Sequence, residues 1–411
     1  MSKKSPQLRF EGFTDDWEER KLGDISYKVK EKNKTGEFTE TLTNSAEYGI
    51  INQRDFFDKD ISNAKNLTGY YVVKNDDFVY NPRISNFAPV GPIKRNKLGR
   101  TGVMSPLYYV FRTHDIDKNY FEKYFDTVYW HRFMELNGDS GARADRFAIK
   151  DSVFVEMPIP YPTMDEQQKI GSFFKQLDDT IALHQRKLDL LKEQKKGYLQ
   201  KMFPKNGAKV PELRFAGFAD DWEERKLSDV ANHRGGTAIE KYFDKYGVYK
   251  VISIGSYGLN SQYVDQNIRA ISNEITDGRV VNSGELTMVL NDKTANGTII
   301  GRTLLVEKDN EYVINQRTEI ISPKENFDSN FAYTILNGPF REKVKRIVQG
   351  GTQIYVNYPA VSNLNLELPK IEEQQKIGSF FKQLDDTIAL HQRKLDLLKE
   401  QKKGFLQKMF V

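Results

Sequence analysis

Two segments of this 411-residue sequence each occur twice, and this internal repeat constrains the fold more than any other feature. Residues 166–203 recur at 373–410 with a single tyrosine-to-phenylalanine change. A shorter motif at 8–25 returns with a few changes at 213–230. A repeat of this kind indicates that one structural plan is built twice along the chain.

The repeats give the two halves the same order of parts. Each half has a leading motif, a variable segment and a long charged helix, with abrupt changes from near identity to almost none. A recent duplication with drifting loops would instead predict gradual divergence. The predicted parts are a leading motif at 1–25, a first variable domain at 26–160, a spacer helix at 163–204, a linker with the repeated motif at 205–230, a second variable domain at 231–368 and a second spacer helix at 369–411.

The repeated charged segment predicts a long helix with one apolar stripe. Apolar residues fall at alternating spacings of three and four, which is a heptad seam. Such a helix needs a partner, and its own copy is the sequence certain to match. We therefore expect an antiparallel coiled coil with one variable domain at each end, in a pseudo-twofold arrangement. The seam residues are Phe174, Leu177, Ile181, Leu188 and Leu191, with Phe381, Leu384, Ile388, Leu395 and Leu398 in the copy.

Local signals refine the two helices. Thr163 and Glu166 form a possible capping box at the first helix, and Pro369 can occupy the first turn of the second. Gly197 is a point at which the first helix can end or bend. Polar seam residues can fix the register, and the candidate pairs are His184 with His391 and Lys195 with Lys402.

Both variable segments read as mixed α/β domains of one fold with two surfaces, so the fold class is α+β. Short apolar runs bounded by glycine, asparagine and proline predict strands, each set followed by a helix. The expected strands are 70–73, 78–80 and 107–112 in the first segment, and 286–290, 298–306 and 312–321 in the second. The expected helices are 120–136 and 341–348.

The first variable segment contains a basic stretch without acidic residues between Arg83 and Arg112, which predicts a track for DNA phosphates. Arginine suits guanine edges, and asparagine or glutamine suits adenine. The candidate DNA-binding residues of the first domain are Asn81, Arg83, Ser85, Asn86, Lys94, Arg95, Lys97, Arg100, Arg143 and Arg146. Those of the second domain are Asn291, Lys293, Thr294, Asn296, Gln316, Arg317, Thr352, Gln353, Tyr355 and Asn357.

Several kinds of catalytic site have no matching motif in this sequence. Without cysteine, and with five scattered histidines, no zinc or other metal site is expected. Adjacent prolines and a Gly-Lys pair are also missing, which excludes the Asn-Pro-Pro-aromatic motif of DNA methylation and the ATP-binding P-loop. Asp15, Asp16 and Lys21 resemble a nuclease motif, but Trp17 among them favours a packed turn. No apolar run predicts a membrane span or signal peptide, so we expect a cytoplasmic protein.

Two leading motifs of the form Leu-Arg-Phe-x-Gly-Phe-x-x-Asp-Trp-Glu, with proline-containing strands running into Glu-Gln-Gln-Lys-Ile at 166–170 and 373–377, resemble type I restriction-modification specificity subunits. The resemblance covers the whole chain. It implies that each variable domain reads one half of a bipartite site in double-stranded DNA, while the helices set the gap and dock two modification (methyltransferase) subunits.

The resemblance also implies that this chain carries no cofactor and is not an enzyme on its own. S-adenosylmethionine for adenine N6 methylation would belong to the modification subunits, and ATP and Mg to translocating restriction subunits. The alternative is a stand-alone DNA-binding protein or a coiled-coil adaptor. Steep salt dependence of DNA binding would argue against the adaptor.

Overall fold

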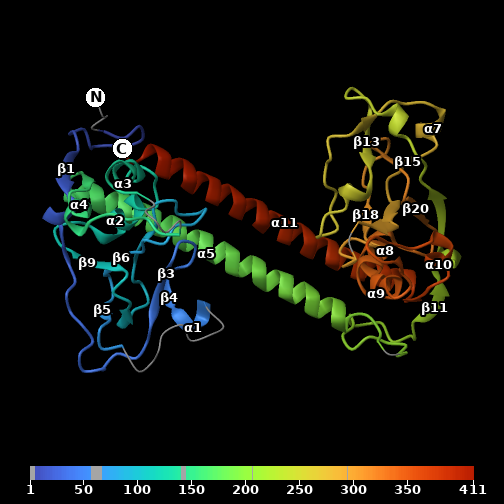
Figure 1. The fold of residues 1–411 in the computed structure, drawn as a ribbon. Coiled ribbons are helices and arrows are strands. Elements are labelled where there is room, and N and C mark those ends of the chain that lie inside the picture. Colours follow the sequence, from blue (N-terminus) through green and yellow to red (C-terminus); the bar gives the residue numbers. More distant parts are fainter. Residues whose placement is uncertain (1–4, 57–66, 140–144, 206, 294) are drawn as a thin grey trace. The chain divides into compact units, whose positions relative to one another are not determined.

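The computed structural model describes residues 5–56, 67–139, 145–205, 207–293 and 295–411. Two compact units are present, and the first is built from two segments that are distant in sequence. The first contains residues 1–185 and 393–411, and the second contains residues 186–392 (Figure 1). None of the helices in the described ranges has the length and hydropathy needed to cross a membrane.

The first unit is centred on a four-stranded antiparallel sheet in the order β2-β9-β6-β7. These strands are β2 (Ser26–Lys28), β9 (Tyr109–Thr113), β6 (Phe78–Tyr80) and β7 (Ile93–Arg95). Three two-stranded pairs accompany it: β1 (Glu18–Lys21) with β10 (Pro158–Tyr161), β3 (Leu42–Ser45) with β4 (Gly49–Asn52), and β5 (Tyr71–Val73) with β8 (Gly102–Met104). Its short helices are η1 (Leu22–Asp24), α1 (Gln53–Phe56), α2 (Lys118–Tyr124), α3 (His131–Asn137) and α4 (Asp151–Phe154).

The second unit repeats this plan with a sheet in the order β12-β20-β16-β18. These strands are β12 (Ala231–Gly235), β20 (Thr318–Pro323), β16 (Leu286–Val289) and β18 (Thr303–Leu305). A mixed sheet joins β14 (Arg269–Ala270), β13 (Tyr249–Ile252), β19 (Tyr312–Ile314) and β15 (Val280–Val281). A small three-stranded sheet joins β17 (Asn291–Asp292), β22 (Ile354–Tyr355) and β21 (Gln349–Gly350). A further pair consists of β11 (Glu223–Lys226) and β23 (Asn365–Leu368). Its short helices are α6 (Leu227–Val230), η3 (Glu240–Tyr242), η4 (Ile254–Ser256), α7 (Glu274–Asp277), α8 (Ser329–Asn337), α9 (Pro339–Lys345) and α10 (Tyr358–Ser362).

The mixed α/β prediction is confirmed, and several predicted elements are interrupted. The helix expected at 120–136 is two helices, because Thr127 turns the chain and its hydroxyl donates to the Tyr124 carbonyl at 2.7 Å. The strand expected at 312–321 is split into β19 and β20 by a turn in which Arg317 has a φ of 65°. Only 303–305 of the strand expected at 298–306 is a strand, and α8 was not predicted.

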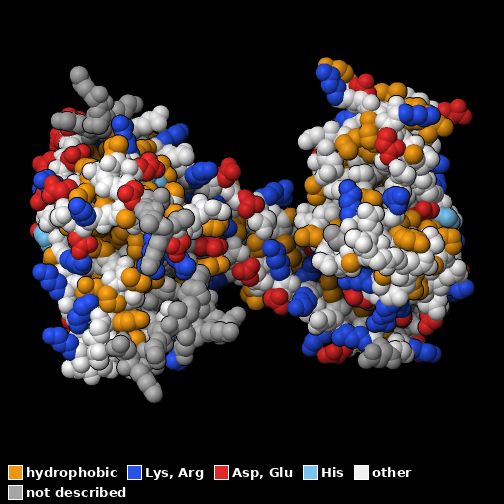
Figure 2. All heavy atoms as spheres, in the orientation of Figure 1, with side chains coloured by type: hydrophobic (Ala, Val, Ile, Leu, Met, Phe, Trp, Pro, Cys, Tyr) orange, Lys and Arg blue, Asp and Glu red, His pale blue; other side chains and the backbone are white. Residues whose placement is uncertain are grey.

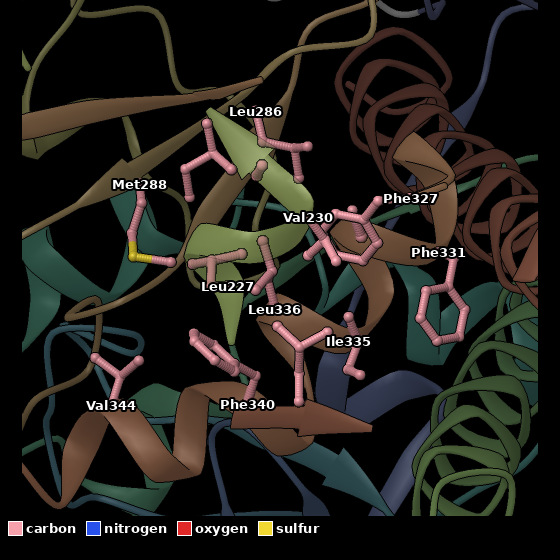
Figure 3. Close-up of a cluster of buried hydrophobic side chains, with 14 of the residues drawn as sticks. Leu227, Val230, Leu286, Met288, Phe327, Phe331, Ile335, Leu336, Phe340 and Val344 are labelled. Carbon is pink, nitrogen blue, oxygen red and sulfur yellow. The ribbon is translucent and has the colours of Figure 1, made fainter. Parts of the chain in front are cut away.

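The core of the second unit lies between α8, α9 and the sheet (Figure 3). Phe331 and Phe340 from the two helices and Leu286 from β16 are almost completely buried. Burying a side chain of this size stabilises the fold by roughly 1.5–3 kcal/mol. These buried side chains therefore hold α8 and α9 against the sheet.

The two long helices, α5 (Met164–Lys201) and α11 (Ile371–Lys408), pack together within each unit. In the first unit Phe173 contacts Phe405, with ring centroids 5.0 Å apart. In the second, Tyr198 contacts Phe380 at 5.1 Å. Along the contact, residue numbers increase in α5 as they decrease in α11, so the helices are antiparallel and the prediction is confirmed. The ten predicted seam residues are all buried or half-buried.

Three local predictions about these helices are wrong. The seam lysines do not face each other, because each pairs with an aspartate of the other helix: Lys195 with Asp385 at 2.5 Å, and Lys402 with Asp178 at 2.7 Å. Gly197 does not interrupt α5, and α11 begins two residues after Pro369, at Ile371.

The start of each long helix is fixed by a clamp to the leading motif. Glu166 is fully buried and accepts both bonds of the Arg9 guanidinium fork, at 2.6 and 2.8 Å, and a third from Trp17 Nε1 at 3.1 Å. Its side chain is therefore not available for the predicted capping box, of which only the Thr163 half is formed. In the second unit Glu373 accepts the same fork from Arg214. These contacts explain why the leading motif and the helix start are repeated together.

The end of each long helix completes the core of the other half. Met409 and Phe410, which follow α11, are buried in the core of the first unit. Met202 and Phe203, which follow α5, are buried in that of the second. Each unit therefore needs residues from both copies of the repeat.

A buried charge cluster joins α2 to both long helices in the first unit. Lys123 lies 2.8 Å from Asp126 and 2.7 Å from Asp178, which also pairs with Lys402. Burial opposes ionisation of Asp126, yet Lys123 and then Lys94 outweigh it and hold the pKa of Asp126 well below its ordinary value.

Candidate nucleic-acid interface

The second unit gathers four of the predicted DNA-binding residues around one recess of about 420 Å³. Asn291 on β17 and Tyr355 on β22 are direct cross-strand neighbours. Arg317 precedes β20, and Asn357 follows β22. These residues come from three distant parts of the sequence, and the small β17-β22-β21 sheet brings them to one edge of the recess.

Arg317 is held in a fixed position at this recess. Its backbone has a φ of 65°, a left-handed conformation that is costly for a residue with a side chain. The turn is secured by the Leu290 amide, which donates to the Arg317 carbonyl at 3.0 Å. With the amide of Asn291 oriented to satisfy both its atoms, its oxygen accepts from Arg317 Nη1 at 2.8 Å and its nitrogen donates to the Leu290 carbonyl at 3.2 Å.

Glu319, which lines the recess, is paired with a histidine of the neighbouring strand β12. His233 Nδ1 lies 2.6 Å from Glu319 Oε1, and the His233 ring lies 4.5 Å from the ring of Tyr358. Burial raises the pKa of Glu319 above its ordinary value, and the hydrogen bond to His233 opposes this shift. Sequence reasoning missed these three residues, because no local pattern connects β12, β20 and α10.

The other candidates of the second unit lie on loops near the same small sheet. Lys293, Asn296, Thr352 and Gln353 are exposed. Gln316 donates to Glu240 at 2.9 Å, so its amide is engaged within the domain. Thr294 lies outside the described residues. DNA contact by any of these residues stays a prediction.

The first unit has a recess of about 670 Å³ at the corresponding place in its fold. The isolated bridges Arg83–Arg146 and Asp139–Ala148 stand where the second unit has β17-β22 and β22-β21. Lys28 of β2 pairs with Asp151 at the start of α4, beside the recess. The rest of its lining differs from that of the second recess. It includes the aromatic and apolar residues Tyr80, Leu107 and Phe147 and the polar residues Asn137, Asp139 and Lys150. Each domain thus has a recess at the same place in its fold, and the two recesses are lined by different residues.

The basic stretch of the first unit is not an uncompensated track of positive charge. Acidic residues from other segments neutralise most of it: Lys94 pairs with Asp126, Arg95 and Lys97 with Glu122, Arg100 with Glu40, and Arg112 with Asp77. Figure 2 shows basic and acidic side chains interspersed over the visible face of this unit. The sequence stretch has no acids of its own, and the fold supplies them; contact of these residues with DNA phosphates stays a prediction.

Among the remaining candidates that the structure describes in the first unit, Arg83 is the most accessible cation. Its side chain is 67% exposed and lies 3.8 Å from Asp145. Asn81 is engaged within the domain, donating to the Asn44 carbonyl at 2.8 Å and accepting from the Arg83 amide at 3.0 Å. Ser85 and Asn86 are exposed on a turn, and Arg146 is half-buried. Arg143 lies outside the described residues.

One exposed aromatic residue was also missed. Phe87 is 80% exposed in the turn closed by the Ser85–Ala88 bridge. Exposed apolar side chains at loop tips can insert between DNA bases. The only sequence signal was an isolated phenylalanine within the polar run Ser-Asn-Phe-Ala-Pro.

Comparison with known proteins gives a consistent result. The family model described as type I restriction modification DNA specificity domain matches residues 14–193 and again 219–400. The MjaVIII type I restriction enzyme specificity subunit of Methanocaldococcus jannaschii is 24% identical over 272 residues, which are 63% of this chain. The match spans 62% of that curated relative, a little under two thirds of its length.

Solved structures share the fold. The S subunit of a type I restriction-modification system from M. genitalium superposes with a TM-score of 0.63 at 12% identity, covering 99% of both chains. A chain from a structure on complex assembly and conformational transition of the type I R-M system gives a TM-score of 0.52 at 14% identity, covering 96% of this chain and 97% of that one.

Proposed function

This chain belongs to the type I restriction-modification DNA specificity family, and we propose that it is the DNA-recognition subunit of such a complex. The first variable domain reads one half of a bipartite site in double-stranded DNA, and the second reads the other half. The chain has no catalytic role of its own and directs the chemistry of its partners.

The observation that carries this proposal is one fold built twice around two differently lined recesses. A chain that reads one symmetric site would need the same lining in both domains. Here the second recess presents Asn291, Arg317 and Asn357, whereas the first presents Asn137, Asp139 and Lys150 beside a lysine–aspartate pair. Different hydrogen-bonding groups read different bases, so the two halves of the DNA site differ.

The partners in this proposal are two modification subunits, which methylate adenine N6 with S-adenosylmethionine, and restriction subunits, which use ATP and Mg to cleave unmodified DNA. The complex acts in the cytoplasm. Nearly identical sequence on the two long helices supports two copies of one partner, because almost the same surface is offered twice. The helices also set the unread gap, since each of 38 residues has a length of about 57 Å.

The test is to express the chain with and without its cognate modification subunits and to map N6-methyladenine in genomic DNA by single-molecule sequencing. We expect methylation at one split motif, present only when both components are made. Exchanging residues 26–160 for the corresponding segment of a relative with another specificity should change one half of the motif and leave the other half intact. Absence of methylation from a stably assembled complex would refute the proposal.

A further inference from the structure

We propose that Arg317 is the specificity-determining residue of the second domain and that it pairs with a guanine in the half-site this domain reads. The inference rests on the proposed function and deepens it, because it assigns a base to a side chain. It follows from the charge, the orientation and the surroundings of the Arg317 guanidinium in the recess.

The charge of Arg317 is not used to hold the domain together. Three arginines of the second unit are bound to carboxylates, Arg214 to Glu373, Arg234 to Glu285 and Arg269 to Asp265. Arg341 is buried and donates to three backbone carbonyls. Arg317 is instead held by a neutral amide, that of Asn291, and the residue is exposed. It is therefore a cation that is positioned but not neutralised by its contact.

The contact with Asn291 does not involve the Nε–Nη2 edge of the Arg317 guanidinium. Asn291 accepts from Nη1. The Nε and Nη2 donors, which form one edge of the planar fork, remain directed to other partners. Two parallel donors on one edge match the O6 and N7 acceptors of guanine in the major groove. Asn291 is thus a positioning residue that fixes which edge of Arg317 is presented.

The surroundings favour a base over a phosphate. Glu319 lines the same recess, and a carboxylate there disfavours a second anion. Tyr355 and Asn357, which also line it, offer further polar contacts to a base edge. A phosphate site would instead be expected to combine several cations.

The first domain provides an internal comparison. Its recess is lined by Leu107, which lies two residues before Tyr109, the partner of Tyr80 in β6. Arg317 likewise lies two residues before Glu319, the partner of Met288 in β16. Leu107 is 58% exposed and cannot donate a hydrogen bond from its side chain. The corresponding place in the first domain therefore cannot select guanine in this way, which agrees with two half-sites of different sequence.

The experiment compares the wild-type chain with the variants Arg317→Ala, Arg317→Gly and Asn291→Ala, each in complex with the modification subunits. Glycine adopts a positive φ without strain, so an effect shared by the first two variants does not come from a distorted turn. Arg225→Ala is the matched control, because Arg225 is an exposed arginine that pairs with Glu223 on β11. Methylation rates are measured on duplexes carrying each base at each position of both half-sites.

We expect the wild-type complex to require guanine at one position of one half-site. Both Arg317 variants should lose about 5- to 150-fold of that discrimination at this position only, the range expected for one bidentate pair. Asn291→Ala should lose a smaller part of it, and Arg225→Ala none. The other half-site and the gap should be unchanged.

Two results would overturn the inference while leaving the proposed function standing. One is unchanged base preference at every position in the Arg317 variants. The other is uniform weakening on all duplexes with a reduced salt slope, which would identify a phosphate contact. If the Arg317 variants do not assemble, unchanged preference in Asn291→Ala overturns it. A wild-type complex that methylates no split motif refutes the proposed function, and the inference fails with it.

Discussion

The two halves of this chain contain the same tryptophan in two different hydrogen-bonding situations, and this allows a test with an internal control. Trp17 and Trp222 occupy the same place in the repeated leading motif and are 5% and 4% exposed. Trp17 Nε1 donates to the buried Glu166 carboxylate at 3.1 Å. Trp222 Nε1 is buried and has no acceptor among the described residues. The change Trp→Phe therefore removes a bond in one unit and an unsatisfied donor in the other.

The hydrogen-bond contributions to the free energy of unfolding should change in opposite directions in the two variants, and both variants also lose packing. Trp17→Phe should cost about 1.5 kcal/mol, the lower end for a hydrogen bond to a charged group, because Arg9 still neutralises Glu166. Trp222→Phe should recover about 1 kcal/mol or more, the cost of a buried donor without a partner. Both variants lose the same ring atoms, so the loss of packing largely cancels. The difference between the variants should be about 2.5 kcal/mol or more.

Hydrogen exchange read by mass spectrometry measures this difference, because peptides from β1 and β10 report on the first unit and peptides from β11 and β23 on the second. Local opening free energies are compared with those of the wild-type chain. Equal losses in the two units would refute the reasoning, because the shared packing change alone would then explain both. A greater loss in the second unit would contradict it more strongly.

Three further predictions follow from contacts in the structure. Gly171→Ala and Gly378→Ala should each destabilise the chain by about 1–3 kcal/mol, because an added Cβ would lie 2.5 Å from Asp117 Oδ1 or 2.6 Å from the Phe331 amide. Gly197→Ala, which meets nothing within 4 Å, should stabilise α5 by up to about 1 kcal/mol, and thermal unfolding distinguishes the three. The pKa values of Asp126 and Asp178 are lower in the folded state than in the unfolded chain. Their ionised carboxylates therefore stabilise the first unit above the unfolded pKa, and this stability should be lost as the pH falls below about 4. Denaturant unfolding between pH 6 and pH 2 measures this loss, and Asp126→Asn should reduce the pH dependence. A free energy of unfolding that has the same pH dependence in the variant as in the wild-type chain would contradict the prediction. Inserting one heptad at matching places in both α5 and α11 should lengthen the unread DNA gap by about three base pairs, because seven helical residues span about 10.5 Å. Methylation mapping measures the gap, and an unchanged gap would show that the helices do not set it.

The sequence repeat predicted the large features of this fold because they depend on patterns that recur. The heptad spacing identified Phe174, Leu188 and their copies as a seam, and the structure buries them. The antiparallel direction followed from the position of each helix at the end of its half, because a pseudo-twofold arrangement places two such helices antiparallel. Partners across that seam were not predictable, because which lysine meets which aspartate depends on the register.

The candidate site was predicted less well, for a physical reason. Asn291, Arg317 and Tyr355 were selected as residue types suited to base edges, and the fold brings them to one recess. The ion pairs that compensate the basic stretch of the first domain could not be predicted, because pairs such as Arg100–Glu40 join residues distant in sequence. His233 and Glu319 were missed because their pairing exists only after β12 and β20 have formed a sheet.

The dependence of the first unit on Met409 and Phe410 has a consequence for synthesis on the ribosome. The second unit lies wholly within residues 186–392, so its parts are all made before those that complete the first. Residue 393 follows residue 185 by 208 positions, which at 5–20 residues per second is a delay of roughly 10–40 s. During this time the apolar site that receives Phe410, beside Tyr120, has no occupant from its own chain. The domain that is translated first is therefore the last to finish folding, and a nascent chain that stalls before residue 393 exposes an unfilled core.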